Sequence, residues 1–132
     1  MLYTNALKVA VKAHRKQKRR DWRAYVTHPI RVANNLKDEW EKVQAVALLH
    51  DVVEDTYMCR KELLEEGIPN DVIDIVMIVT KRHNEAYDTY IWRVLGNEIA
   101  RKVKIADIMD NLWDDPSRKQ IDKYVLALEE LL

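Results

Sequence analysis

The chain has 132 residues, 48% of them hydrophobic, and its 22 basic and 22 acidic residues give a formal net charge of zero. This length and apolar content predict one folded domain over residues 1–132 and exclude a disordered protein. The balanced charge disfavours a nucleic-acid partner, and a single cysteine with no apolar run of membrane-spanning length predicts a cytoplasmic protein without a membrane partner.

An all-α fold is predicted, because only two glycines and three prolines interrupt a sequence rich in helix formers. The first helix is expected over residues 3–17, with Leu7, Val11 and His14 along one stripe. We interpret His14 as a packed or capping side chain. A second helix is expected to begin at residues 27–29, because proline is favoured in the first turn of a helix.

The segment from residue 12 to residue 23 is strongly basic, with seven basic side chains and one acidic one. The basic side chains are Lys12, Arg15, Lys16, Lys18, Arg19, Arg20 and Arg23. The rest of the chain is therefore net acidic. A short patch of this kind suits a small polyanion better than a long duplex.

The central helix is expected over residues 41–56. Side chains able to bind a metal or move a proton would share an arc of about 140° on this helix. They are His50, Asp51, Glu54 and Asp55. The opposite arc is apolar and would face the core, through Val46, Leu48, Leu49, Val52 and Val53. Burying three carboxylates together is unfavourable without a compensating cation, so this face predicts a metal site.

Shorter helices complete the predicted fold. They are expected over residues 60–66, from Pro69, over 86–95 and 97–112, and after a cap at Asp115 and Pro116. Their predicted core positions are Val72, Ile73, Val76, Met77, Val79, Ile105, Ile108, Leu112, Ile121, Tyr124, Leu128 and Leu131.

Two residues distant from the central helix would complete the metal site. His28 stands at the start of the second helix, and Asp107 shares one helix face with Asn111, four residues later. Short connections between antiparallel helices would bring these side chains to one pocket. A mixed nitrogen and oxygen donor set suits Mn, Fe, Co or Zn, and open positions for water and phosphate favour Mn²⁺.

The sequence resembles the metal-dependent HD phosphohydrolase superfamily, and more closely the hydrolase domain of the Rel/SpoT alarmone enzymes and their stand-alone small relatives. Four segments carry the resemblance, in the family's order. They are Ala13 to Arg20, Tyr25 to Pro29, Ala47 to Thr56, and Val103 to Asp107 with Asn111 and Leu112. An HDxxED motif with an upstream HP and a downstream KxAD is specific for this branch.

The resemblance implies a role for each matching polar residue. The implied metal ligands are His28, His50, Asp51 and Asp107. The residues implied to position and activate the attacking water are Glu54 and Asp55. The implied nucleotide contacts are Arg19, Arg20, Asn111 and Tyr124.

By this resemblance the chain is a metal-dependent pyrophosphohydrolase that acts on guanosine 3′,5′-bis(diphosphate) or a related nucleotide and is compatible with a homo-oligomer. Two alternatives keep the same site: a nucleotidase that acts on a nucleoside monophosphate or another phosphoester, and a non-catalytic nucleotide-binding sensor. The synthetase and regulatory domains of the long Rel enzymes are lacking, so we expect no alarmone synthesis. Asp110 stands where the relatives tend to have His or Tyr.

Overall fold

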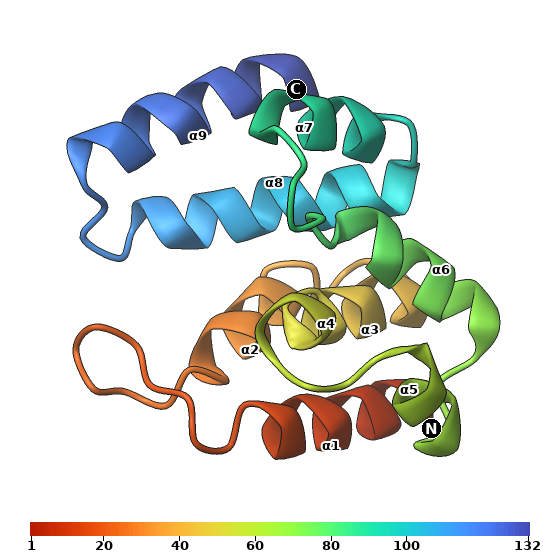
Figure 1. Ribbon diagram of the computed structural model, residues 1–132. Coiled ribbons are helices and arrows are strands. Elements are labelled where there is room, and N and C mark those ends of the chain that lie inside the picture. The colour runs from red at the N-terminus through yellow and green to blue at the C-terminus, as the bar shows by residue number, and fades with distance from the viewer.

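Nine α-helices and their connections make up the computed structural model, which describes all 132 residues (Figure 1). The helices are α1 (Leu2–Ala13), α2 (Thr27–Asn34), α3 (Glu41–Leu49), α4 (Val52–Asp55), α5 (Arg60–Glu65), α6 (Asn70–Val79), α7 (Tyr87–Leu95), α8 (Glu98–Leu112) and α9 (Arg118–Leu131). No strand forms, and an isolated β-bridge joins Lys18 to Ala24 in the connection after α1. The all-α prediction is confirmed. None of the helices combines the length and the hydropathy that crossing a membrane requires.

Helices α3 and α8 lie at the centre of the fold. α3 packs against α1, α2, α6 and α8, while α8 also contacts α6, α7 and α9. Figure 1 shows α1 and α5 on one side of α3, with α7 and α9 beyond α8 on the other side. Buried side chains from these layers form one core that includes Leu48, Ile73 and Ile108. The facing surfaces of α3 and α8 therefore bring residues distant in the sequence together.

The first helix is shorter than predicted, because it ends at Ala13 with His14 as its C-cap. Its buried residues are Ala6, Val9 and Ala10. Val11 was placed on one stripe with Leu7 and His14, but the residue is 47% exposed whereas His14 is buried. The face of α1 that packs against α3 carries Ala6, Val9 and Ala10, and Val11 points away because it follows Val9 by two residues, about 200° around the helix. His14 is buried, which agrees with its interpretation as a packed or capping side chain.

The central helix is not continuous over residues 41–56 as predicted. It is divided into α3 and α4, and His50 and Asp51 stand between the two helices. The break has a local cause, because His50 Nδ1 lies 2.6 Å from the carbonyl oxygen of Ala47, the acceptor that an unbroken helix would offer to the Asp51 N–H. His50 is buried as a result, whereas Glu54 and Asp55 keep the exposed side of α4.

Helices α5 to α8 begin within one residue of their predicted starts, but two core assignments, one in α6 and one in α9, were wrong. Met77 is 38% exposed, because it follows Val76 by one residue and so lies about 100° around α6 from the buried face. Ile121 is 40% exposed in the first turn of α9, ahead of a buried stripe that begins at Tyr124.

The cap of the last helix also differs from the prediction at Asp115 and Pro116. Ser117 is the N-cap, and its Oγ accepts a hydrogen bond from the Gln120 N–H at 3.1 Å. The Gln120 side chain accepts one from the Ser117 N–H at 2.9 Å. This reciprocal pair satisfies two N–H groups that the first turn leaves free, which an acceptor at Asp115 could not do.

The connection between α6 and α7 is fixed by one ion pair. Arg93 of α7 donates to Glu85 at 2.8 and 3.2 Å and to the carbonyl oxygens of Ile78 and Thr80 at 2.8 and 3.1 Å. The Glu85 carboxylate also accepts the Arg82 N–H at 3.0 Å. These bonds hold residues 80–86 against the end of α6, beside the broken central helix.

Candidate metal centre and its cleft

Four side chains from separate elements meet at one point in the interior. They are His28 of α2, His50 and Asp51 between α3 and α4, and Asp107 of α8. Their donor atoms all lie within 4.8 Å of one another. Oδ1 of Asp107 is 2.8 Å from Nε2 of His28 and 3.2 Å from Nε2 of His50. Oδ2 of Asp51 lies 3.5 and 3.2 Å from the same two nitrogens. The four residues that the sequence predicted as ligands therefore converge.

The hydrogen bonds of the two imidazoles suit a divalent cation at this point. Nδ1 of His28 donates to Oδ2 of Asp110 at 2.7 Å, and Nδ1 of His50 donates to the Ala47 carbonyl at 2.6 Å. Because Nδ1 carries a proton in each ring, Nε2 is the nitrogen that would turn a lone pair toward a bound cation. Metal-binding histidines are commonly oriented in this way by a carboxylate or carbonyl behind the ring. The donor set of two imidazole nitrogens and two carboxylates therefore fits a divalent ion.

The charges at the centre also favour a cation. Burial by itself would raise the pKa of Asp107, but Lys104 and then His50 outweigh it and hold this pKa well below its ordinary value. Burial likewise opposes ionisation of Asp51, yet His50 lowers its pKa to about 2. Both carboxylates are therefore ionised at neutral pH, and although burial opposes it, Asp51 and Asp107 in turn raise the pKa of His50, and Asp107 raises that of His28. A divalent cation bound at this point would replace the Nε2 protons that otherwise balance the two carboxylates.

Glu54 and Asp55 of α4 line a cleft of about 370 Å³ beside the four converging residues. Oε1 of Glu54 accepts the Lys81 N–H at 2.9 Å, which fixes this carboxylate against the connection between α6 and α7. Oδ2 of Asp55 accepts a hydrogen bond from Gln17 Nε2 at 3.3 Å. Burial raises the pKa of both carboxyl groups, and Asp51 adds to the rise. A carboxylate with a raised pKa is a stronger general base.

A second cavity, of about 240 Å³, adjoins this cleft and carries the basic residues. The two cavities share Tyr25, Asn111 and Tyr124 as lining residues. Arg19 and Arg20 line only the second one. The two predicted arginines therefore line a cavity that adjoins the cleft beside the metal centre. Asn111 Nδ2 donates to Oδ1 of Asp107 at 3.1 Å, so this predicted nucleotide contact also touches a candidate ligand.

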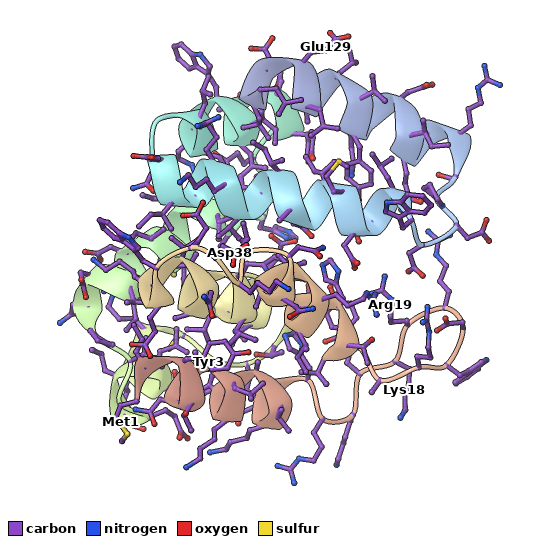
Figure 2. The ribbon with its side chains drawn as sticks, turned by 180° about the vertical axis from the view of Figure 1, so that it is seen from behind. Met1, Tyr3, Lys18, Arg19, Asp38 and Glu129 are labelled. Atoms are coloured by element: carbon purple, nitrogen blue, oxygen red, sulfur yellow. The ribbon has the colours of Figure 1, made fainter.

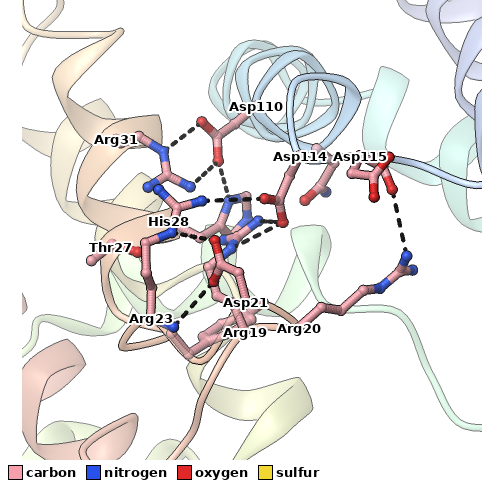
Figure 3. Close-up of polar contacts among 12 residues, drawn as sticks. Arg19, Arg20, Asp21, Arg23, Thr27, His28, Arg31, Asp110, Asp114 and Asp115 are labelled. Carbon is pink, nitrogen blue, oxygen red and sulfur yellow. Dashed lines mark hydrogen bonds and ion pairs between the residues drawn. The ribbon is translucent and has the colours of Figure 1, made fainter.

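The arginines are held by residues near the connection of α8 and α9. Figure 2 shows Arg19 extending from its loop toward that connection. Arg19 Nε donates to Asp114 at 3.0 Å, and Nη2 contacts the same carboxylate (Figure 3). Its side chain is 5% exposed, and its buried Nη1 has no hydrogen-bond partner. Arg20 donates to Gln120 at 3.1 Å. Arg19 thus keeps one donor free for a ligand.

Several residues of the site were not singled out from the sequence. Tyr25 donates its hydroxyl to Oδ2 of Asp51 at 2.6 Å, and Lys104 Nζ donates to Oδ2 of Asp107 at 2.8 Å. The position of Lys104 three residues before Asp107 on a helix could have indicated this contact. Tyr25 lies in an irregular connection where no periodicity applies. The remaining missed residues of the cleft are Lys81, Tyr87, Tyr90 and Lys123.

Known proteins similar to this chain carry related chemistry. A rice protein (Oryza sativa subsp. japonica) described as a putative chloroplastic GTP diphosphokinase RSH1 is 42% identical over 96% of this chain, which spans 16% of the rice protein. A probable guanosine-3′,5′-bis(diphosphate) 3′-pyrophosphohydrolase of Mycoplasma pneumoniae is 34% identical over 64% of this chain and 12% of its own length. The chain therefore spans less than a fifth of these relatives.

One solved structure matches nearly the whole chain. It is described as a metazoan ortholog of SpoT that hydrolyzes ppGpp, and it superposes with a TM-score of 0.78 at 29% identity. The match covers 98% of this chain and 83% of the other chain. The family model of the HD domain matches residues 6–88, which include three of the four converging residues. The chain belongs to the HD domain family, and within it is similar to the Rel/SpoT alarmone enzymes.

Proposed function

We propose that this chain is a divalent-metal-dependent hydrolase that releases pyrophosphate from the 3′ position of guanosine 3′,5′-bis(diphosphate) or a closely related nucleotide. The observation that carries the proposal is the convergence of two oriented imidazoles and two ionised carboxylates beside an acidic pair that lines a cleft. The similarity to a ppGpp-hydrolysing protein over 98% of the chain supports the same substrate class.

The cation is held, in this proposal, by His28, His50, Asp51 and Asp107, and we propose Mn²⁺ because it accepts both imidazole and carboxylate donors. A bound divalent ion supplies Lewis acidity toward a phosphoryl oxygen and lowers the pKa of water. The protein's part is to keep both histidines in the tautomer that turns Nε2 inward. Asp107 lies beyond the residues matched by the family model, so its assignment rests on the geometry and on the KxAD motif of the resemblance.

Glu54 acts as the general base. Hydrolysis adds the oxygen of water to phosphorus, breaks the bond from phosphorus to the 3′ oxygen, and returns a proton to that oxygen. Glu54 accepts the proton that water loses, because its carboxylate lines the cleft and its pKa is raised by burial. Asp55, held by Gln17, orients the water. The products are pyrophosphate and a nucleotide with a free 3′ hydroxyl.

The nucleotide extends from the metal centre into the second cavity. Asn111 and Tyr124 line both cavities and would contact the ribose and the part of the nucleotide next to it. Arg19 offers its unpartnered Nη1, and Arg20 lies beside it in the same cavity. Guanidinium groups suit phosphate or base recognition, because their donors are planar and permanently charged.

Release of pyrophosphate from guanosine 3′,5′-bis(diphosphate) tests the proposal. We expect turnover with Mn²⁺, its loss on chelation, and its loss in the His50→Ala variant. His83→Ala is a matched control, because His83 is exposed and lines neither cavity. Turnover that persists in His50→Ala would contradict the proposal. Hydrolysis of nucleoside monophosphates alone would indicate a nucleotidase, and nucleotide binding without turnover of any phosphoester would indicate a sensor.

The proposal also covers the bounds of the domain and the cellular compartment of the protein. We take residues 1–132 as one HD phosphohydrolase domain, since helices on both sides of residue 88 form one core. The exposed thiol of Cys59 suits a reducing compartment such as the cytoplasm. Cell fractionation is the direct test, because the rice relative is described as chloroplastic.

A further inference from the structure

Three lysines line the cleft that contains the acidic pair. They come from the connection after α6, from α8 and from α9, and we call them the lysine cluster: Lys81, Lys104 and Lys123. Tyrosines separate them. The ring centre of Tyr87 lies 5.9 Å from Lys104 Nζ and 4.6 Å from Lys123 Nζ. The cleft also contains four carboxylates, from Asp51, Glu54, Asp55 and Asp107, and a cation bound at the candidate metal centre would offset part of their charge and leave the lysines available to an anion.

Lys104 connects this cluster to the metal centre. Its Nζ donates to Oδ2 of Asp107 at 2.8 Å, while Oδ1 of the same carboxylate faces His28 and His50. One carboxylate therefore has the candidate cation position on one oxygen and the lysine cluster on the other. An anion that reaches past the metal centre along this side of the cleft meets Lys104 and then the ring of Tyr87.

Lys104 is the member of the cluster that pairs with a carboxylate, whereas Lys81 and Lys123 form no ion pair within the protein. Lys81 Nζ donates to the Arg82 carbonyl oxygen at 3.3 Å, and Lys123 Nζ lies over the rings of Tyr87 and Tyr124, at 4.6 and 5.0 Å from their centres. Lys123 is an exposed residue, and the desolvation that it does experience lowers its pKa, with a further lowering from the nearby charge of Lys104. An ammonium group held in this surrounding gains free energy from an incoming anion.

Tyr87 gives a second, independent indication of a ligand. Tyr87 lines the same cleft, and its hydroxyl is buried and has no hydrogen-bond partner in the protein. Buried hydroxyl groups are nearly always paired, because an unpaired one forfeits its hydrogen bonds to water. A phosphate group would accept a hydrogen bond from this hydroxyl and form an ion pair with Lys123 beside it.

We propose that Lys123 and Tyr87, assisted by Lys81, form an anion subsite for the second phosphate of a diphosphate whose first phosphate lies at the metal centre. The subsite makes the cleft selective for diphosphate esters over monophosphate esters. This inference rests on the proposed function only in placing the first phosphate beside the four converging residues. It assigns the selectivity to Lys123, a residue outside the motifs that identify the family.

Equilibrium binding of two anions tests the subsite without turnover. Methylenediphosphonate, which resists hydrolysis, and methylphosphonate are titrated by calorimetry into the full chain loaded with Mn²⁺ and freed of excess metal. Metal content is measured after each titration to verify that the ligand has not removed the ion. The variants are Lys123→Gln and Tyr87→Phe. Lys119→Gln is the control, because Lys119 is exposed on the same helix and lines neither cavity.

We expect Lys123→Gln to weaken methylenediphosphonate binding about tenfold or more, as for loss of a charge-assisted bond. Methylphosphonate binding should change less than about threefold, and Lys119→Gln should affect neither anion. Tyr87→Phe should weaken only the diphosphonate. Equal losses for both anions, or none in Lys123→Gln, would overturn the inference. The proposed function is judged separately. If the wild type hydrolyses the alarmone and Lys123→Gln binds methylenediphosphonate as tightly as the wild type, only the subsite is rejected. If the wild type binds the diphosphonate selectively but does not hydrolyse the alarmone, only the reaction is rejected.

Discussion

Asp110 accepts a hydrogen bond from Nδ1 of His28 at 2.7 Å, so a residue that does not face the metal centre determines which nitrogen of His28 does. Arg31 donates to the same carboxylate at 2.9 and 3.1 Å. Burial opposes the negative charge, but His28 and Arg31 hold the pKa of Asp110 far below its ordinary value. An ionised Asp110 therefore fixes both the tautomer and the orientation of this imidazole.

Removal of the Asp110 carboxylate should weaken metal binding. We expect Asp110→Ala to lower the affinity for Mn²⁺ by about 10- to 100-fold, because His28 loses the group that orients it. Asp110→Asn should lose less, since its amide oxygen still accepts the hydrogen bond. Calorimetric titration of Mn²⁺ measures both effects, with Asp38→Asn as the exposed control. An unchanged affinity for Mn²⁺ in a folded Asp110→Ala protein would show that the Asp110 carboxylate does not orient His28.

Neutralising Glu54 should affect the reaction without affecting the metal. Glu54→Gln keeps the size of the side chain and its contact with the Lys81 N–H, but the amide cannot accept a proton from water. We expect kcat to fall by about 10²- to 10⁴-fold, the usual contribution of a general base, while Mn²⁺ content stays the same. Pyrophosphate release and elemental analysis provide the two measurements. Glu65→Gln, at an exposed position of α5, is the control, and a loss of metal in Glu54→Gln would reassign Glu54 as a ligand.

The ion pair of Glu85 with Arg93 should make stability depend on pH. Hydrogen bonds from Arg93 and from the Arg82 N–H lower the pKa of Glu85 from 4.5 to about 2. Because the folded state has the lower pKa, the pair stabilises the protein above about pH 4.5, and this stabilisation is lost as the pH falls toward 2. Glu85→Gln should therefore reduce the free energy of unfolding at pH 7 by about 1–3 kcal/mol.

Urea denaturation at pH 7, 4.5 and 3 measures this effect. The difference between wild type and Glu85→Gln should be largest at pH 7 and should shrink below pH 4.5, because protonation of Glu85 removes the same charge as the substitution. A difference that stays constant across the three pH values would assign the destabilisation to packing instead.

Gly67 and Gly96 should respond oppositely to alanine. Gly67 follows α5 with φ +87°, and an added Cβ would lie 3.2 Å from Nδ2 of Asn5. A side chain in this left-handed conformation costs about 1–2 kcal/mol. Gly96 has a helical φ of −72°, where alanine is neutral or stabilises by up to about 1 kcal/mol. Thermal unfolding of Gly67→Ala and Gly96→Ala compares the two, and equal melting temperatures would contradict the assigned backbone conformation.

Local patterns predicted most of the helices, and a motif resemblance predicted the four residues that converge. The interruption at His50 was not predicted, because helix periodicity describes side-chain directions on an unbroken ladder and contains no information on a side chain that binds the backbone of its own last turn. Val11 was misassigned for a related reason. Periodicity allows more than one apolar stripe on α1, and contact with α3 decides which stripe is buried.

The parts of the site outside helices or outside motifs were harder to predict. Tyr25 reaches Asp51 from an irregular connection, where the sequence has no repeat to indicate a direction. Lys123 and Tyr87 lie in the same cleft only because α9 and α7 both pack on α8. Contacts of this kind depend on how helices are placed in three dimensions, and single-sequence patterns do not contain that information.

The metal centre joins residues that are 79 positions apart, since His28 and Asp107 belong to α2 and α8. An unfolded chain cannot offer both side chains to one ion, so an occupied centre favours the native state by mass action. Supply of the ion would then govern abundance as well as turnover: cells starved of it would hold fewer copies of this protein, because empty chains open more often and are degraded sooner.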